Sequence, residues 1–410
     1  MHTLKLTKKY ETYPEYKDSG VEWLGKIPKE WGLNKFKADF KVSDDRVSDY
    51  PTVQTLLSVS GYRGIETKNI DSLEGQMPSE DVSDYRIVRP GQLVVNTMWL
   101  NYTGLGVSNY EGYVSPAYRA YTISDKLSPR FVNHLMRSNL YVQKYSSLLY
   151  GIRPNSLQVK TYDFEKIEIL IPPKAEQEKI ANYLDEKTTY IDQIIQKKQK
   201  QIELLKEKRS AVINYAVNNV SGDSEKLKYI APERKVKLDT APSDSKYIGL
   251  ENIESGTGKL IDSKEKSEPE SSVNVFKAGD VLFGKLRPYL AKVFSTDCDG
   301  VCSGEFLTLI PKTNKVASKY LFYKLISKDF IKAVDDSTYG AKMPRANWQS
   351  IGNLMITYPS LDKQSKIVAS LDSKLEVFEL SINKVNRSIE ILQEFKSSLV
   401  SSVVTGKIKI

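Results

Sequence analysis

The residues of this chain whose types and spacing could do chemistry are cations and tyrosines. In the stretch "GKLRPYL", Lys285, Arg287 and Tyr289 occupy alternate positions, so a continuous strand would place their side chains on one face. An arginine can bind the O6 and N7 atoms of guanine with two hydrogen bonds, and a lysine reaches phosphates. Pro288 favours a sheet edge or a turn at this point. The pattern indicates a surface that binds a polyanion; a solvated surface loop is the alternative interpretation.

A second basic segment, "AKMPR", places Lys342 and Arg345 on a loop stiffened by proline. We interpret both mainly as phosphate contacts, which fix register without reading sequence. The matching places in the first half of the chain hold amides and aromatic rings: Asn96, Trp99, Asn101, Tyr102, Tyr150 and Arg153. An asparagine can bind adenine with two hydrogen bonds, whereas Trp99 and Tyr150 suit a core or loop role equally well.

Residues for covalent, metal or cofactor chemistry are scarce. The cysteines are Cys298 and Cys302, and the histidines are His2 and His134. This set excludes a disulfide scaffold and argues against a four-ligand zinc site. The stretch "SGTGKL" lacks the first glycine and the final Ser or Thr of a phosphate-binding loop. We therefore predict no catalytic residue, no metal and no cofactor bound by this chain.

The composition bounds the class of protein. With 410 residues, 40% of them hydrophobic, the chain suggests two or three domains with their own cores. The net charge of +9, from 60 Lys and Arg against 51 Asp and Glu, favours a polyanionic partner. No run approaches the roughly 18 apolar residues of a membrane span, and the start of the chain lacks the pattern of a signal peptide. We expect a cytoplasmic protein without a membrane partner.

The elements that must position these residues lie in a chain that repeats part of its own sequence. The stretch "IPPKAEQEKIANYLD" returns as "TYPSLDKQSKIVASLD", with Ile180 and Ile367 separated by 187 residues. Because a core needs no matching polar residues, we predict that these repeated segments bind partner proteins. The predicted partner-binding residues are Gln177, Lys179, Ile180, Leu184, Gln364, Lys366, Ile367 and Leu371. Packing of Ile180 and Leu184 on their own globular part is an equally open alternative.

Each repeated segment begins a stripe of apolar residues with a seven-residue period. Prolines precede each stripe, and no further proline or glycine occurs before Gly222 in the first copy and Gly406 in the second. A stripe held over about four heptads predicts a long helix of about 45 residues, roughly 65 Å. We expect two such helices, within 171–221 and 358–410, to pack as an antiparallel coiled coil.

The segments ahead of the helices repeat as well. "RPGQLVV" resembles "KAGDVLF", a tight glycine turn that enters an apolar strand, and "SPRFVNHLMRS" resembles "SKYLFYKLIS", an amphipathic helix. The fold class is therefore α+β, with two globular mixed α/β domains and a pseudo-twofold internal repeat. We place the first domain at 1–170, with an N-terminal extension at 1–30, and the second at 222–357.

Four further segments carry a resemblance to a known family. They are "YKDSGVEWLGKIPKEW" (16–31), "YIGLENI" (247–253), "GDVLFGKLRPYLAKV" (279–293) and "GAKMPRANW" (340–348). With the two helix starts, in this order and with this duplication, the chain resembles the specificity subunit of type I restriction-modification systems along nearly its whole length. The first half departs most, because it has "VVNTMWLNYTGLGV" where the second has "VLFGKLRPYLAKV".

The resemblance implies a DNA-binding subunit without chemistry of its own. Each globular part would be a target recognition domain that reads one half of a bipartite, asymmetric site in double-stranded DNA. The helices would act as a spacer whose length sets the gap between half-sites. They would dock two methyltransferase (M) subunits and, in the full complex, two restriction (R) subunits. S-adenosylmethionine, ATP and Mg are implied on those partners, which carry the adenine-N6 methylation and the ATP-dependent cleavage.

Two other classes of protein remain as alternatives. A coiled-coil adaptor that carries two protein-binding modules would have the heptads and the repeat, but it leaves the positive charge unexplained. A self-contained DNA methyltransferase or nuclease would need a cofactor motif, and the chain has neither a glycine-rich one nor the Asn/Asp-Pro-Pro-aromatic motif of amino-methyltransferases.

Overall fold

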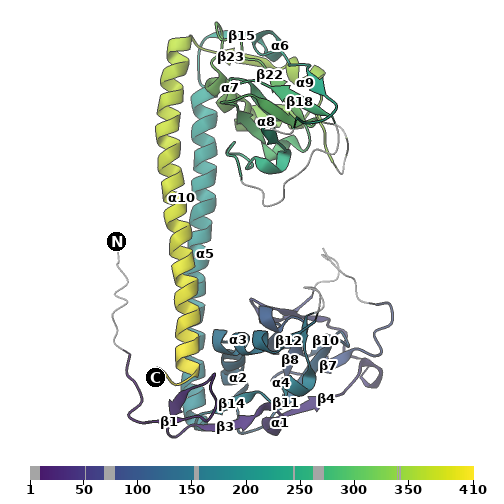
Figure 1. Cartoon of the computed structure of the whole chain (residues 1–410), viewed down its shortest axis with the longest axis vertical. Coiled ribbons are helices and arrows are strands. Elements are labelled where there is room, and N and C mark those ends of the chain that lie inside the picture. Colours follow the sequence, from purple (N-terminus) through teal and green to yellow (C-terminus); the bar gives the residue numbers. More distant parts are fainter. Residues whose placement is uncertain are drawn as a thin grey trace. The chain divides into compact units, whose positions relative to one another are not determined.

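The chain folds into two compact units (Figure 1). Unit 1 comprises Met1–Gln196 with Ser388–Ile410, and unit 2 comprises Lys197–Arg387. The structure is a computed structural model, and it describes residues 10–50, 52–68, 79–151, 157–242, 245–261, 272–338, 340 and 343–410. Each unit combines a globular α+β part with one end of each of two long helices.

The central sheet of unit 1 has four antiparallel strands in the order β4-β11-β8-β9. These are β4 (Phe40–Ser43), β11 (Tyr118–Ile123), β8 (Leu93–Asn96) and β9 (Leu105–Val107). All four residues of β8 are buried, as its apolar "LVVN" sequence requires of a strand covered on both faces. Two smaller sheets accompany it, formed by β5 (Leu57–Ser60) with β6 (Gly64–Thr67) and by β7 (Arg86–Val88) with β10 (Gly112–Val114).

Unit 2 repeats the centre of this arrangement with three antiparallel strands in the order β20-β19-β22. These are β20 (Val293–Ser295), β19 (Val281–Gly284) and β22 (Phe306–Leu309). A second sheet has the order β16-β18-β21-β17, formed by β16 (Lys237–Leu238), β18 (Val273–Phe276), β21 (Gly300–Ser303) and β17 (Tyr247–Ile248).

The register of the two central sheets is the same. Leu93 pairs with Val107 on one side and with Tyr121 on the other. Val281, which lies 188 residues later, pairs with Ser295 and Leu309, each also 188 residues later than its counterpart. A strand that slipped by one residue would turn its buried face outward, so equal register means that both units build the same scaffold. The predicted internal repeat is thus present in the strand pairing.

Short helices join each sheet to the long helices. In unit 1 these are α2 (Pro129–Met136) and α3 (Asn139–Ser147), and in unit 2 they are α7 (Ser318–Leu325) and α8 (Lys328–Asp335). In unit 1, Phe131 of α2 shares one buried apolar cluster with Tyr121 of the sheet and Leu184 of the long helix. The helices and the sheet of each unit therefore share a core. The remaining short helices are α1 (Phe36–Asp39), α4 (Thr161–Phe164), α6 (Leu227–Ile230) and α9 (Trp348–Gly352).

A two-stranded antiparallel pair closes each globular part next to a long helix. In unit 1, β3 (Gly32–Lys35) pairs with β14 (Glu168–Ile171), and in unit 2, β15 (Asp223–Lys226) pairs with β23 (Met355–Tyr358). The other two pairs of unit 1 are β1 (Tyr16–Asp18) with β2 (Lys26–Pro28) and β12 (Leu149–Tyr150) with β13 (Gln158–Val159). The backbone N–H of Lys409 also donates a 2.9 Å hydrogen bond to Glu11 O.

The long helices are α5 (Lys174–Asn218) and α10 (Leu361–Val404), which lie within the two predicted ranges. In each unit the beginning of one helix packs beside the end of the other (Figure 1), so they run antiparallel as the heptads predicted. Lys396 interrupts the apolar stripe, and its Nζ pairs with Asp192 at 2.7 Å. Among the described residues, no helix combines the length and the apolar character needed to span a bilayer.

Candidate nucleic-acid interface

The site is built on two equivalent hairpin tips. Tip 1 (residues 96–104) joins β8 to β9, and tip 2 (residues 284–292) joins β19 to β20. Each tip contains one turn of 3-10 helix, η3 (Leu100–Tyr102) in tip 1 and η6 (Pro288–Leu290) in tip 2. Since the flanking strands share one register, residues 188 positions apart occupy equivalent places on the two tips.

Both tips carry backbone strain at the same place. Thr103 (φ 60°) and its counterpart Ala291 (φ 47°) have a left-handed backbone, and so does Arg287 (φ 48°). Within the part of the chain that the structure describes, these are the three non-glycine residues with positive φ. Such a conformation costs of the order of 1 kcal/mol or more and is found preferentially at functional sites. The tips are therefore candidates on backbone geometry alone.

Contacts of an asparagine and a glycine at the two ends of tip 1 hold its backbone in place. Asn96 is buried, and its Oδ1 accepts a 3.1 Å hydrogen bond from the backbone N–H of Met98. The N–H of Gly104 donates to Trp99 O at 2.8 Å, and a Cβ at Gly104 would lie 2.6 Å from that oxygen, so only glycine fits. Asn96 thus supports the tip, and its predicted contact with adenine stays a prediction.

The outer surface of tip 1 is aromatic. The rings of Trp99 and Tyr102 lie 5.7 Å apart, centroid to centroid, and both are exposed. Asn101 is half-buried, and its Oδ1 has no hydrogen-bond partner among the described residues. Tyr150 is exposed, with Lys160 Nζ 4.7 Å from its ring centroid. Arg153, also predicted to contact DNA, lies outside the described residues.

The strand does not continue through "GKLRPYL", so the condition for one shared face is not met. Strand β19 ends at Gly284, and Arg287 takes a left-handed backbone before the 3-10 turn. The alternation that places every second side chain on one face therefore stops before Lys285. The turn that Pro288 favoured is present instead, and Tyr289 projects from it with half of its surface exposed.

Tip 2 meets the second basic segment. The N–H of Arg287 donates a 2.8 Å hydrogen bond to Pro344 O, and Leu286 forms a bridge with Arg345. Arg345 is paired with the Glu305 carboxylate. Lys285 is half-buried, and burial lowers its pKa although Glu305 acts in the opposite direction. Lys285 and Arg345 thus lie near one acid, Glu305, and the backbone of Arg287 is bonded to the loop that carries Arg345, whereas Lys342 lies outside the described residues.

The repeated helix starts have a structural role that the sequence did not reveal. Gln177 is fully buried. Its Oε1 accepts a 2.7 Å hydrogen bond from the N–H of Ser128, and its Nε2 donates to Lys126 O at 3.0 Å and Pro172 O at 2.8 Å. One side chain therefore satisfies three backbone groups where α5, α2 and β14 converge.

We call this place, where a buried glutamine bonds the globular part to its long helix, the joint of the unit. Unit 2 contains the same joint. Gln364 is fully buried, and its Oε1 accepts a 2.9 Å hydrogen bond from the N–H of Ala317. Its Nε2 donates to Lys315 O and to Pro359 O, each at 2.8 Å. The polar residues that we took for a docking motif hold each globular part to its own helix.

The predicted partner-binding set is therefore corrected. Five of its members are buried within their own unit and cannot form an exposed docking surface there: Gln177, Ile180, Leu184, Gln364 and Leu371. For Ile180 and Leu184, the alternative of packing on their own globular part is the correct one. Lys179 and Lys366 are exposed and Ile367 is half-buried, so for these three the prediction stands untested.

The Leu-Asp pair of each repeat adds a charged contact to the joint. Asp185 accepts hydrogen bonds from Arg130 Nε at 2.8 Å and contacts His134 Nε2 at 2.6 Å. Burial would raise the pKa of Asp185, but the hydrogen bonds from His134 and Arg130 outweigh it and lower that pKa. In unit 2, Asp372 accepts a hydrogen bond from Tyr323. The aspartate that both repeats retain could have indicated this joint from the sequence. Its partners are not repeated, however, so no repeated pair of residues pointed to the contact.

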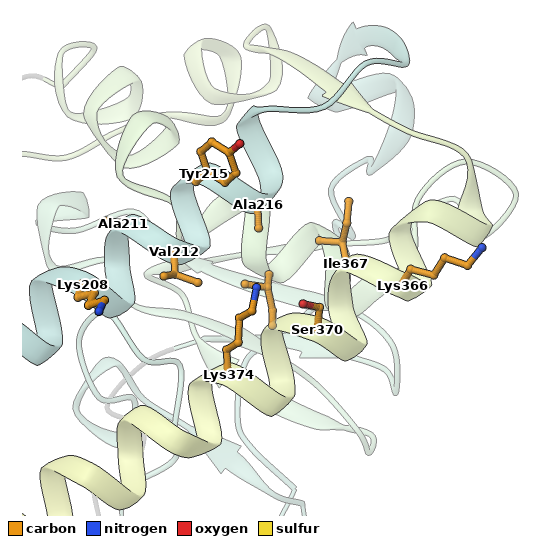
Figure 2. A pocket seen from close by; sticks show the side chains of 10 residues that line it. Lys208, Ala211, Val212, Tyr215, Ala216, Lys366, Ile367, Ser370 and Lys374 are labelled. Atoms are coloured by element: carbon orange, nitrogen blue, oxygen red, sulfur yellow. The ribbon is translucent and has the colours of Figure 1, made fainter.

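An open groove lies beside the start of α10 in unit 2 (Figure 2). Its volume is about 520 Å³. Apolar side chains from both helices line it, and lysines stand along it. The lining residues are Lys208, Ala211, Val212, Tyr215, Ala216, Lys366, Ile367, Ser370, Leu371 and Lys374. In unit 1, the residue equivalent to Ser370 is Tyr183, which is hydrogen-bonded to Tyr10 of the N-terminal segment. The corresponding surface of unit 1 is thus partly covered by the chain itself.

Acidic and sulfur ligands are not grouped for a metal. Within the described ranges, no cluster of three or more His, Cys, Asp or Glu side chains could hold an ion. Cys302 is buried, and burial raises the pKa of its thiol to about 12, so the thiol is protonated at neutral pH.

A family comparison decides the class of protein. The model of the "Type I restriction modification DNA specificity domain" matches residues 106–204 and again residues 227–393, together more than half of the chain. The chain belongs to this family. The specificity family thus matches the chain twice, and the second match contains tip 2 and the start of α10.

Relatives agree with the specificity family. The chain is 20% identical over 342 residues to the EcoDI specificity subunit of Escherichia coli, covering 74% of this chain and 75% of that one. It is 23% identical over 314 residues to the EcoKI specificity subunit of E. coli K12, covering 68% and 65%. A solved structure described as showing assembly and conformational transition of a type I R-M system matches with a TM-score of 0.67 and 13% identity, over 92% of this chain and 98% of that one. The last match concerns the fold alone.

Proposed function

We propose that this chain reads DNA for a type I restriction-modification complex, with one half of a bipartite, asymmetric target read by each unit. The observation that carries the proposal is the pair of tips. They share strand register and a left-handed residue at the same place, but they present different side chains. A repeated strand register with unlike residues on the tips suits a target whose two half-sites differ in sequence.

The chemistry of the tips supports base and phosphate contacts. On tip 2, Arg287 can bind a guanine edge and Lys285 a phosphate. On tip 1, Asn101 and Tyr102 offer an amide and a phenol for base edges. The net charge of +9 adds a sequence-independent attraction that releases counterions and weakens with salt. Hydrogen bonds and charge attraction are enough for the tips to bind DNA, and neither requires a catalytic group.

The chemistry would belong to the partners. Two methyltransferase subunits would carry S-adenosylmethionine and flip an adenine out of the duplex to reach it. Two restriction subunits would bring ATP and Mg for cleavage. For docking, we propose the exposed remainder of the helix starts, Lys179 in unit 1 with Lys366 and Ile367 in unit 2. The complex would act on DNA in the cytoplasm.

The test is methylome sequencing of a host that expresses this chain with the methyltransferase subunit of its own operon. We expect a split motif: two short half-sites, a fixed unspecified gap, and one modified adenine on each strand. No motif, with both proteins associated, would favour the adaptor. A continuous motif would mean that the two units do not read DNA independently.

A further inference from the structure

Tip 1 exposes three large apolar side chains that lie close together in the sequence. Met98, Trp99 and Tyr102 are 42%, 59% and 65% exposed, within five consecutive residues. Isolated exposed apolar residues are ordinary, but a contiguous group marks a contact surface. The equivalent residue to Trp99 on tip 2 is Arg287, since the positions differ by the shared offset of 188. The two tips thus differ at this position in backbone as well as in side chain, because Trp99 has φ −125° and Arg287 has φ 48°.

A half-buried arginine holds tip 1 in place. The guanidinium of Arg137 donates to Gly61 O at 2.9 Å, to Tyr62 O at 3.1 Å and to Thr103 O at 3.4 Å. Burial lowers the pKa of Arg137 to about 10. A guanidinium has five donors in a fixed fork, so it can bind several carbonyls at once. Arg137 therefore connects tip 1 to the loop at Gly61 and Tyr62 that joins β5 to β6.

The same loop packs tightly under the tip. A Cβ at Gly61 would lie 2.2 Å from Tyr102 O, so the two backbones approach as closely as glycine allows. With the Asn96 and Gly104 contacts, the tip has support on several sides while its rings face solvent. Rigid exposed rings lose little conformational entropy on binding.

We propose that Trp99 inserts into the half-site read by unit 1 and stacks on a base there, with Tyr102 beside it. The inference rests on the DNA-reading function proposed above and adds the residue and the kind of contact. Aromatic side chains stack on bases irrespective of sequence, and large apolar side chains act as wedges at base steps that are unstacked in a complex. Tip 2, with Arg287 in the equivalent place, would read by hydrogen bonds and charge.

The test uses the chain with its methyltransferase subunits and duplexes that carry the motif from the methylome. 2-Aminopurine replaces one base at a time in both half-sites. With the wild-type complex, we expect a fluorescence change at one step of one half-site that Trp99→Ala abolishes and Trp99→Phe largely keeps. Trp99→Ala should weaken binding by roughly 5- to 100-fold and leave the slope of log K against log salt unchanged, because no phosphate contact is lost.

Arg287→Ala is the matched control on the equivalent position. It should leave the Trp99-dependent fluorescence change in place and reduce the salt slope by about one if the arginine also touches a phosphate. Wild-type affinity in Trp99→Ala, in a complex that binds its motif, would overturn the stacking proposal alone. A lower salt slope in Trp99→Ala would also overturn it. A wild-type complex without preference for its motif would overturn the reading function itself.

Discussion

The two tips have the same strand register and unlike chemistry. Both follow a buried strand, make one 3-10 turn and end at a left-handed residue. Tip 1 then exposes Trp99 and Tyr102, whereas tip 2 presents Arg287 and Tyr289 beside an acid-paired arginine. Strand register and the 3-10 turn are thus repeated, whereas the backbone at Trp99 and Arg287 and the side chains that the tips present are not. This difference is what an asymmetric two-part target requires of an internally repeated protein.

The two joints make the opposite comparison. Gln177 and Gln364 bind the same three kinds of backbone group with nearly equal distances. Here the residue itself is repeated, because the three backbone groups that it bonds are arranged in the same way in both units. In the joints, the buried glutamine that both halves retain has a structural role. On the tips, the residues that differ between the halves are the ones proposed to read DNA.

The largest effect is expected at the joints. Gln177→Leu or Gln364→Leu would leave one N–H and two carbonyls without their partner, each worth about 1–3 kcal/mol when buried. We expect a loss of about 3 kcal/mol in the free energy of unfolding, equal in the two variants, measured by urea denaturation. Lys179→Ala, at an exposed residue on the same turn, should change it by less than about 0.5 kcal/mol.

Hydrogen exchange followed by mass spectrometry separates the two units in this experiment. Each leucine variant should expose the backbone of its own unit first. A loss below about 1 kcal/mol in both variants would show that the glutamine contacts do not hold the joints.

A smaller effect is expected at tip 2. Arg287→Ala removes the cation with the best geometry for a guanine edge, and we expect an affinity loss of about 1–3 kcal/mol for the cognate duplex. Competition binding against duplexes altered in one half-site at a time measures it. The preference of Arg287→Ala for particular bases should weaken in one half-site only. Relaxation in both would break the comparison between independent tips.

The smallest effect is a pH dependence of the joint in unit 1. The Asp185 pKa is lowered in the folded state by His134 and Arg130, so the stabilisation is present above the unfolded pKa and is lost as pH falls through the folded pKa. We expect Asp185→Asn to cost up to about 1 kcal/mol at pH 7, because the pair is partly exposed.

Unfolding curves at neutral pH and near pH 2.5 check the sign of this effect. The wild type should lose more stability over that range than Asp185→Asn does. Glu186→Gln, at an exposed neighbour, is the control and should follow the wild type. Equal pH dependence in all three proteins would mean that the ionised Asp185 contributes nothing to the joint.

The sequence predicted the parts that depend on pattern. The observed long helices lie within the ranges that heptads and glycine-free spans predicted, and the repeat predicted two equivalent α+β parts. The sequence indicated an edge or a turn at Pro288 but did not place the end of β19 at Gly284, because residue alternation continues through "GKLRPYL" although the strand does not. A left-handed arginine cannot be anticipated from propensity, since tertiary contacts impose it.

The joints were missed for a different reason. A glutamine on a helix surface and a buried glutamine that bonds three backbone groups have the same sequence context. What distinguishes them is the approach of Ser128 and Ala317, about 50 residues away in the chain. Polar identity between repeats was the correct observation, and partner docking was the wrong explanation for its buried members.

The central claim is that each tip reads its own half-site. The most direct measurement compares the methylomes of two hosts, one with the wild-type chain and one with Arg287→Ala, each with the same methyltransferase subunit at high expression. The account predicts a split motif in the first host, and in the second the same motif with relaxed bases confined to one half. Relaxation spread over both halves, or a continuous motif in the wild type, would contradict it.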